Sequence, residues 1–213
     1  MSTRAEALPK SLIAAVLALT VAVLGLGGAV LVIKLKPKPT PTTVIDRNLE
    51  SWKEAVDANP KDDVARTAYG LALLDASRVD DALSEFQEAI ELNEKNWVAL
   101  LQLGLLTKAT DPDGALKLIG SAARYAPAAS KAVPFVAQGD LLFKTGDMEG
   151  AKTAYRNAIA DVPYIFEAHV GLAKTLEALG DPKHALKEYQ QAARYVPDDQ
   201  EVADAIARLK GNG

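Results

Sequence analysis

The sequence predicts an all-α protein in which pairs of short helices repeat, preceded by one long apolar helix at the N-terminus. The stretch Asp181–Pro197 returns in altered form at Asp111–Pro127, Asp147–Pro163 and Asp80–Glu94. A chain that repeats one helical unit stacks the copies on one another, because a single copy cannot bury its apolar face. Residues 12–33 are apolar apart from Thr20 and three glycines, which predicts the N-terminal helix.

The N-terminal segment predicts a membrane anchor. After a short tail at residues 1–10, a transmembrane helix is expected over 11–34, because the 22 apolar residues at 12–33 reach roughly 33 Å and a hydrocarbon core measures about 30 Å. The competing interpretation is a cleaved signal peptide, whose apolar region usually has about 7–15 residues. The run is longer than that, so we expect an uncleaved single-pass anchor. Gly25 and Ala29 would let this helix approach another transmembrane helix closely.

A proline-rich linker at residues 35–43 follows the anchor. Pro37, Pro39 and Pro41 favour a polyproline II conformation, which acts as a semi-rigid spacer. Lysines lie on both sides of the apolar run, and their number slightly favours a cytoplasmic location for the C-terminal side.

Composition excludes several kinds of function. Residues 1–43 contain five basic residues and one acidic residue, so the remainder of the chain has a net charge of −8. An acidic body argues against nucleic acid as a partner, because phosphate binding needs clustered lysines and arginines. The chain has no cysteine, which excludes disulfides and thiolate metal sites. His169 and His184 show no metal-ligand spacing, so we expect no metal, no cofactor and no catalytic residue.

The first helix of the body is expected over Val44–Ala58, within a half unit at residues 44–62. Thr43 and Asp46 have the spacing of a capping box, with aspartate in place of glutamate. Asn59 and Pro60 end the helix, because proline disfavours a helical conformation in the residue before it.

Small residues recur at equivalent places in the units that follow. Ala82, Ala115, Ala151 and Ala185 are spaced by 33, 36 and 34 residues, and a second alanine follows each of them seven residues later. Between the two alanines stands a bulky residue, which fills the space that two closely crossing helices leave beside their small residues. The predicted packing positions are Gly70, Ala82, Ala89, Gly104, Ala115, Ala122, Gly139, Ala151, Ala158, Ala173, Ala185 and Ala192.

Turn residues separate the helices of each unit. Gly146-Asp147 and Gly180-Asp181 place a glycine where a left-handed residue ends one helix and an aspartate where it caps the next. Pro127, Pro163 and Pro197 end three of the units, because proline cannot continue a helix.

Together these features resemble the tetratricopeptide repeat, a 34-residue helix-turn-helix unit with small residues at its eighth, twentieth and twenty-seventh positions. The resemblance implies a right-handed α-superhelix, with an array at residues 63–199 and a capping helix at 200–213 that has one solvent-exposed polar face. The four units are expected at 63–96, 97–129, 132–165 and 166–199.

The resemblance also implies a binding groove, because the first helix of each unit lines the concave face in this family. Carried onto this sequence, the groove positions are Val64, Thr67, Leu71, Leu74, Val98, Leu101, Leu105, Val136, Asp140, Phe143, Val170 and Lys174. The N-terminal half of this face is aliphatic, which suits an amphipathic helix or an extended apolar segment.

The hypothesis that follows is a non-catalytic, membrane-tethered scaffold or adaptor that binds another protein and assists the assembly of an envelope complex. The alternatives are a structural accessory subunit of a larger membrane complex, and a homo-oligomer in which a second copy of the chain covers the leucines of the predicted groove. The resemblance to single-pass bacterial proteins of this family implies a body outside the cytoplasm, against the orientation that the lysine count favours.

Overall fold

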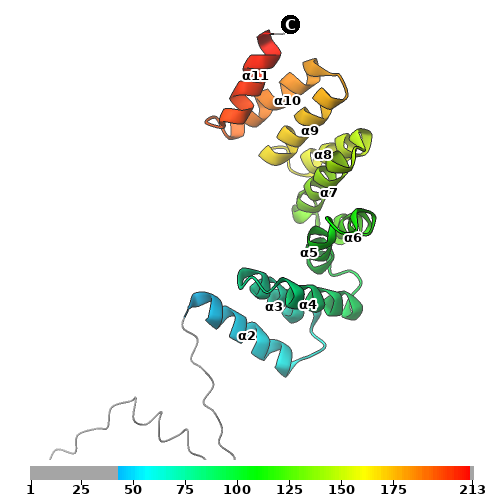
Figure 1. Ribbon diagram of the computed structural model, residues 1–213, viewed down its shortest axis with the longest axis vertical. Coiled ribbons are helices and arrows are strands. Elements are labelled where there is room, and N and C mark those ends of the chain that lie inside the picture. Colours follow the sequence, from blue (N-terminus) through cyan, green and yellow to red (C-terminus); the bar gives the residue numbers. More distant parts are fainter. Residues whose placement is uncertain (1–42, 212–213) are drawn as a thin grey trace, which may run out of the picture. The chain divides into compact units, whose positions relative to one another are not determined.

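The computed structural model describes residues 43–211, and within that range the chain forms ten α-helices, one 3-10 helix and no strand (Figure 1). The predicted tail at 1–10, the predicted transmembrane helix at 11–34 and nearly all of the predicted linker at 35–43 lie outside the described residues. None of the helices between residues 43 and 211 combines the length and the apolar character that a membrane crossing requires.

The helices follow one another in pairs along the chain, and from α2 to α11 each packs against its neighbours in chain order. Their bounds are α2 Val44–Ala58, α3 Asp63–Asp75, α4 Val79–Leu92, α5 Trp97–Thr107, α6 Pro112–Tyr125, η1 Ala128–Ser130, α7 Ala132–Thr145, α8 Met148–Asp161, α9 Phe166–Ala178, α10 Pro182–Tyr195 and α11 Gln200–Gly211. The short 3-10 helix η1 was not predicted, and it occupies the irregular connection between the second and third pairs.

Side-chain caps set the helix boundaries where the sequence predicted them. At α2, Thr43 Oγ1 accepts a hydrogen bond from the backbone N–H of Asp46 at 3.0 Å, and the Asp46 carboxylate accepts one from the Thr43 N–H at 3.0 Å. Asp147 caps α8 by accepting from the N–H of Gly150 at 2.9 Å, and Asp181 caps α10. Each cap satisfies a backbone donor that a helix leaves unpaired at its start.

Glycine in the first helix of a pair admits a large side chain from the second. A Cβ atom added to Gly70 would lie 2.7 Å from the Phe86 ring, and one added to Gly139 would lie 2.7 Å from the Tyr155 ring. Phe86 and Tyr155 are buried as a result. Each of the twelve predicted packing positions is buried.

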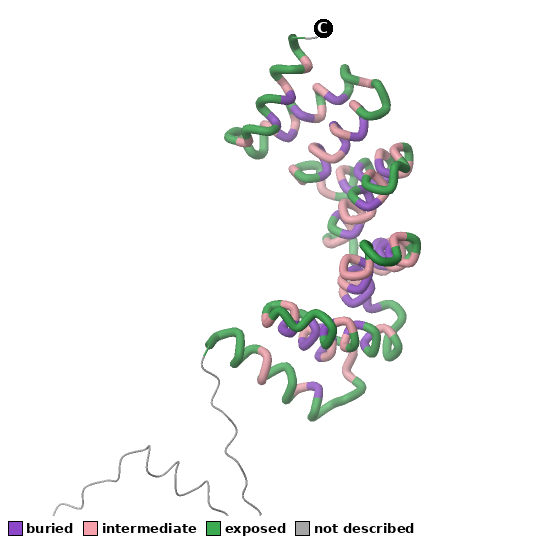
Figure 2. Tube along the Cα trace, in the orientation of Figure 1, coloured by how far each residue is buried: buried purple, intermediate pink, exposed green. Residues whose placement is uncertain are grey.

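The core lies within and between neighbouring pairs, as the buried stretches of the chain in Figure 2 show. Leu103 of α5 packs into the core of the first pair, around Phe86, and Leu172 of α9 packs into the core of the third pair, around Tyr155. A large apolar residue on the first helix of one pair thus anchors that pair to the previous one. The corresponding place in α7 belongs to the half-buried Gln138.

Candidate functional site

The first helices of the pairs form the surface on which the sequence places the groove, and a cavity of about 390 Å³ opens between α3 and α5. Its walls include the predicted groove residues Val64, Thr67, Leu71 and Val98, together with Trp97 at the start of α5. Val64 is 66% exposed and Leu71 is 37% exposed, although both are apolar. This cavity therefore has an apolar rim that water covers in the isolated chain.

A buried polar network underlies the cavity and fixes its shape. Asn96 is buried in the turn before α5, and its amide nitrogen donates to Thr67 Oγ1 and to Asp63 Oδ2, both at 2.8 Å. The Asn96 side-chain oxygen accepts from the N–H of Ala99 at 3.1 Å and so caps α5. Thr67 in turn donates to the carbonyl of Asp63 at 2.7 Å. Thr67 therefore stabilises the wall of the cavity, because its hydroxyl donates to Asp63 and accepts from Asn96 within the fold.

A smaller cavity of about 310 Å³ lies between α5 and α7, and it is lined by Leu105, Val136 and Asp140 among the predicted groove residues. The Asp140 carboxylate accepts a hydrogen bond from the Tyr155 hydroxyl at 2.7 Å. Burial of the tyrosine, followed by this hydrogen bond to a carboxylate, raises the pKa of Tyr155. Asp140 is thus partly committed to positioning α8 against α7.

One predicted groove residue belongs to the core, and two more pack against it. Leu101 is 3% exposed and packs with Ile119 and Leu141, so the prediction that it lines an open groove is wrong. Leu74 is half-buried against the core of the first pair, and Phe143 is half-buried against the core around Tyr155. Leu101 is buried because α6 and α7 supply apolar partners on its side of α5, among them Ile119 and Leu141.

At the C-terminal end the first-helix surface is covered by the chain itself. Val170 packs in a cluster with Val202 and Ala205 of α11. The Lys174 ammonium forms an ion pair with Glu201 of α11 at 2.7 Å. The predicted groove is therefore not continuous, and its open parts are the two cavities beside α5.

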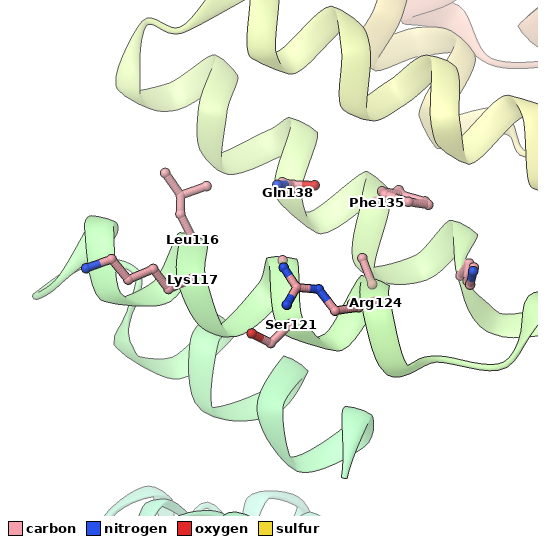
Figure 3. Close-up of a pocket in the computed structure, with 9 residues that line it drawn as sticks. Leu116, Lys117, Ser121, Arg124, Phe135 and Gln138 are labelled. Carbon is pink, nitrogen blue, oxygen red and sulfur yellow. The ribbon is translucent and has the colours of Figure 1, made fainter. Parts of the chain in front are cut away.

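A third cavity, which the sequence analysis missed, lies between α6 and α7 and encloses about 650 Å³ (Figure 3). Its lining comes from two helices, so no single stretch of sequence displays it. The available signal was Gln138, which stands at a place where the other pairs have Tyr69, Leu103 and Leu172.

Within residues 43–211 no group of histidine, aspartate and glutamate side chains has the arrangement of a metal site. His169 is buried, with Nδ1 2.7 Å from Glu188 Oε2 and Nε2 2.9 Å from the carbonyl oxygen of Pro163. Both ring nitrogens are used by the fold, and the ring is closed off from a substrate. The arrangement offers surfaces for binding, and the two cavities beside α5 are the ones that the first helices build.

Comparison with known proteins supports the repeat architecture. One tetratricopeptide repeat family model matches residues 46–96 and another matches residues 142–209. No curated protein sequence matches the chain.

Several solved structures have a similar fold. YrrB, described as a TPR protein with an unusual peptide-binding site, has 17% identity and a TM-score of 0.66 over 77% of this chain and 84% of its own. PilW, described as a widely conserved type IV pilus biogenesis factor, has 18% identity and a TM-score of 0.67 over 79% of this chain and 80% of its own. MamA has 17% identity and a TM-score of 0.63 over 73% of this chain and 96% of its own. At these identities the likeness concerns the fold alone.

Proposed function

The chain belongs to the tetratricopeptide repeat family, and on that premise we propose that it is a non-catalytic scaffold that binds a segment of another protein in the cavity between α3 and α5. The observation that carries the proposal is the exposure of Val64 and Leu71 around this cavity, above a polar network that holds its walls in place. Exposed apolar side chains gathered at a concavity usually mark a contact. The name of YrrB, which speaks of a peptide-binding site on the same fold, supports a peptide-like ligand.

The size and chemistry of the cavity define the segment that it would accept. A volume of about 390 Å³ has room for one or two large side chains. Burial of one leucine-sized side chain contributes roughly 1.5–3 kcal/mol. Asp63 and Lys95 on the cavity lining offer one charge of each sign to the backbone or to polar side chains beside the apolar one. A short segment with one or two apolar anchors therefore fits better than a charged one.

The scaffold is further proposed to be held at a membrane through residues 12–33, with its body outside the cytoplasm, and to assist the assembly of an envelope complex. The length of the apolar run supports the anchor, and the description of PilW as a pilus biogenesis factor supports the assembly role. Protease added to intact cells whose outer barrier has been opened should digest the body if it lies outside the cytoplasm. Protection of the body until the membrane is dissolved would place it on the cytoplasmic side.

The binding site is tested by photo-crosslinking in native membranes. A benzophenone amino acid at Val64 should give one discrete adduct with another protein, because this position lies on the cavity rim. The same amino acid at Val79, which is 45% exposed at the start of α4, is the matched control and should give none. Leu71→Asp should abolish the adduct and leave the helical circular dichroism unchanged, because Leu71 is exposed and outside the core.

Two outcomes would contradict the proposal. Equal adducts from positions 64 and 79 would mean that the cavity is not a preferred contact, and an adduct with the mass of two copies of this chain would favour the homo-oligomer. Leu101→Asp is unsuitable for this test, since a charge at this buried position would unfold the second pair.

A further inference from the structure

The cavity between α6 and α7 has a chemical character of its own. Figure 3 shows side chains from two neighbouring helices around it, with Leu116, Ser121 and Arg124 on α6 and Phe135 and Gln138 on α7. Its apolar lining includes Leu116 and Phe135, and its polar lining includes Ser121 and Gln138. It differs from the cavity of the proposed function because the second helix of a pair, α6, forms one of its walls.

Two residues of the cavity lining, Gly120 and Gln138, differ from their counterparts in the other pairs. Gln138 stands where Tyr69, Leu103 and Leu172 occupy the other first helices, and those three residues are buried. A glutamine amide fully buried in that apolar environment would lose its hydrogen bonds to water, so the Gln138 side chain stays half-buried beside the cavity. Gly120, on α6, lies opposite Gln138 and has no side chain. A Cβ atom added there would lie 3.7 Å from Gln138 Nε2.

Three cations surround the cavity and no acidic side chain does. Lys117 and Arg124 come from α6 and Lys131 precedes α7, and within residues 43–211 none of the three forms an ion pair. Unpaired cations also occur at other places in residues 43–211, and what distinguishes this cavity is that three of them line one recess that has no carboxylate in its lining. A positive cavity on a body with a net charge of −8 therefore has unmet charge of one sign, which favours an anionic ligand.

We propose that this cavity binds an extended acidic segment of a partner protein, with carboxylates on Lys117, Arg124 and Lys131 and one apolar side chain against Phe135. The apolar lining favours a peptide over a small anion, because an anion alone would leave Phe135 and Leu116 uncovered. The recess between two helices favours an extended chain over a flat membrane surface. Arg124 can bind a carboxylate with two parallel hydrogen bonds, which gives the site its specificity.

The test uses the full chain purified in a neutral detergent and a labelled peptide Glu-Glu-Phe-Glu-Glu-Leu-Glu-Glu, with binding followed by fluorescence anisotropy. The peptide should bind with an affinity that falls as salt is added, and a peptide with glutamine in place of every glutamate should not bind. Arg124→Gln should weaken binding about tenfold, because one charge-assisted contact is lost. Arg194→Gln is the matched control, since Arg194 holds the same place in the last pair, and it should leave binding unchanged.

The variant Gln138→Leu tests whether a loss of peptide binding can occur without a loss of stability. Leucine restores the residue type found in the other pairs, so this variant should raise the melting temperature while it weakens peptide binding. Unchanged affinity in Arg124→Gln, or equal binding of the glutamate and glutamine peptides, would overturn the proposal. Displacement of the peptide by inorganic phosphate at constant ionic strength would overturn it in favour of a small anion. Leu71→Asp, which alters the cavity between α3 and α5, should not change the affinity for this peptide. A negative result for the peptide would therefore not bear on the function proposed for the cavity between α3 and α5.

Discussion

Ser77 has a φ angle of +58°, a left-handed conformation that side chains other than glycine adopt at a cost of about 1–2 kcal/mol. It ends the first helix of its pair in the same way as Gly146 and Gly180, whose φ angles are +90° and +77°. In each case the left-handed residue donates its N–H to a carbonyl three residues back, and at Ser77 this bond to Leu74 is 2.8 Å long. Two of the pairs use glycine here, and the first pair uses serine.

Ser77→Gly is expected to stabilise the protein by about 0.5–1 kcal/mol, because relief of the left-handed strain exceeds the extra freedom that glycine gives the unfolded chain. Gly180→Ala is the reciprocal control. A Cβ atom there would meet nothing within 4 Å, so its expected loss of about 1 kcal/mol comes from the backbone alone. Urea unfolding of both variants measures these differences, and a destabilised Ser77→Gly would show that the serine side chain contributes more than its strain costs.

At the scale of the helix, the residues that end and cap helices were predictable from the sequence, and the faces of one helix were not. The α2 bounds, its capping box and the left-handed glycines follow from local chemistry that acts within a few residues. Helix α5 reads W-V-A-L-L-Q-L-G-L-L-T and is apolar nearly all round, so periodicity does not distinguish its buried side from its open side. Leu101 was therefore misplaced on the basis of its repeat position, and only the partners that α6 and α7 supply decide its burial.

The cavity between α6 and α7 was missed for a related reason. Its lining comes from two helices, and a cation such as Arg124 in the last turn of α6 is favoured by the helix dipole alone, so its presence in the sequence does not indicate a cavity. The one signal in the sequence is Gln138, which is polar where its counterparts in the other pairs are large and mainly apolar, and this becomes visible only when the pairs are compared.

The α9–α10 helix pair contains an interaction that depends on pH. His169 Nδ1 faces the Glu188 carboxylate and Nε2 faces the Pro163 carbonyl, which also accepts from the Tyr195 hydroxyl at 3.1 Å. Because both ring nitrogens face acceptors, the doubly protonated ring satisfies both. The hydrogen bond to Glu188 raises the pKa of His169, burial opposes the shift, and the Pro163 carbonyl raises it further.

A raised folded-state pKa means that this stabilisation is fully present below about pH 6.5, the ordinary histidine value, and is lost as pH rises through the folded value. The chain should therefore unfold at a lower urea concentration at pH 8.5 than at pH 6. His169→Gln should reduce that difference, and Glu188→Gln should reduce it too, because the imidazolium loses its partner. Combining the two should add little, whereas an unchanged pH difference in both single variants would assign the dependence to other groups.

At the scale of the described body, each helix contacts chiefly its neighbours in the chain, so the two end helices are held from one side only. Helix α11 is attached by Val202, which is almost fully buried, and by two ion pairs at its surface. In one of them Arg208 donates to Glu177, which also accepts from the Tyr189 hydroxyl. The bond from Arg208, opposed by burial and aided by Tyr189, lowers the pKa of Glu177.

The magnitudes decide which contact holds α11 in place. Surface ion pairs contribute little, since water screens them and long side chains lose freedom to form them. Removing the buried methyl groups of Val202 costs about 2 kcal/mol. Val202→Ala should therefore speed amide hydrogen exchange throughout α11 and leave the first pair unaffected, because stability passes only between neighbours in a stacked array. Arg208→Gln should have a much smaller effect at pH 7, while equal acceleration in the two variants would mean that charge pairing, rather than apolar burial, attaches the last helix.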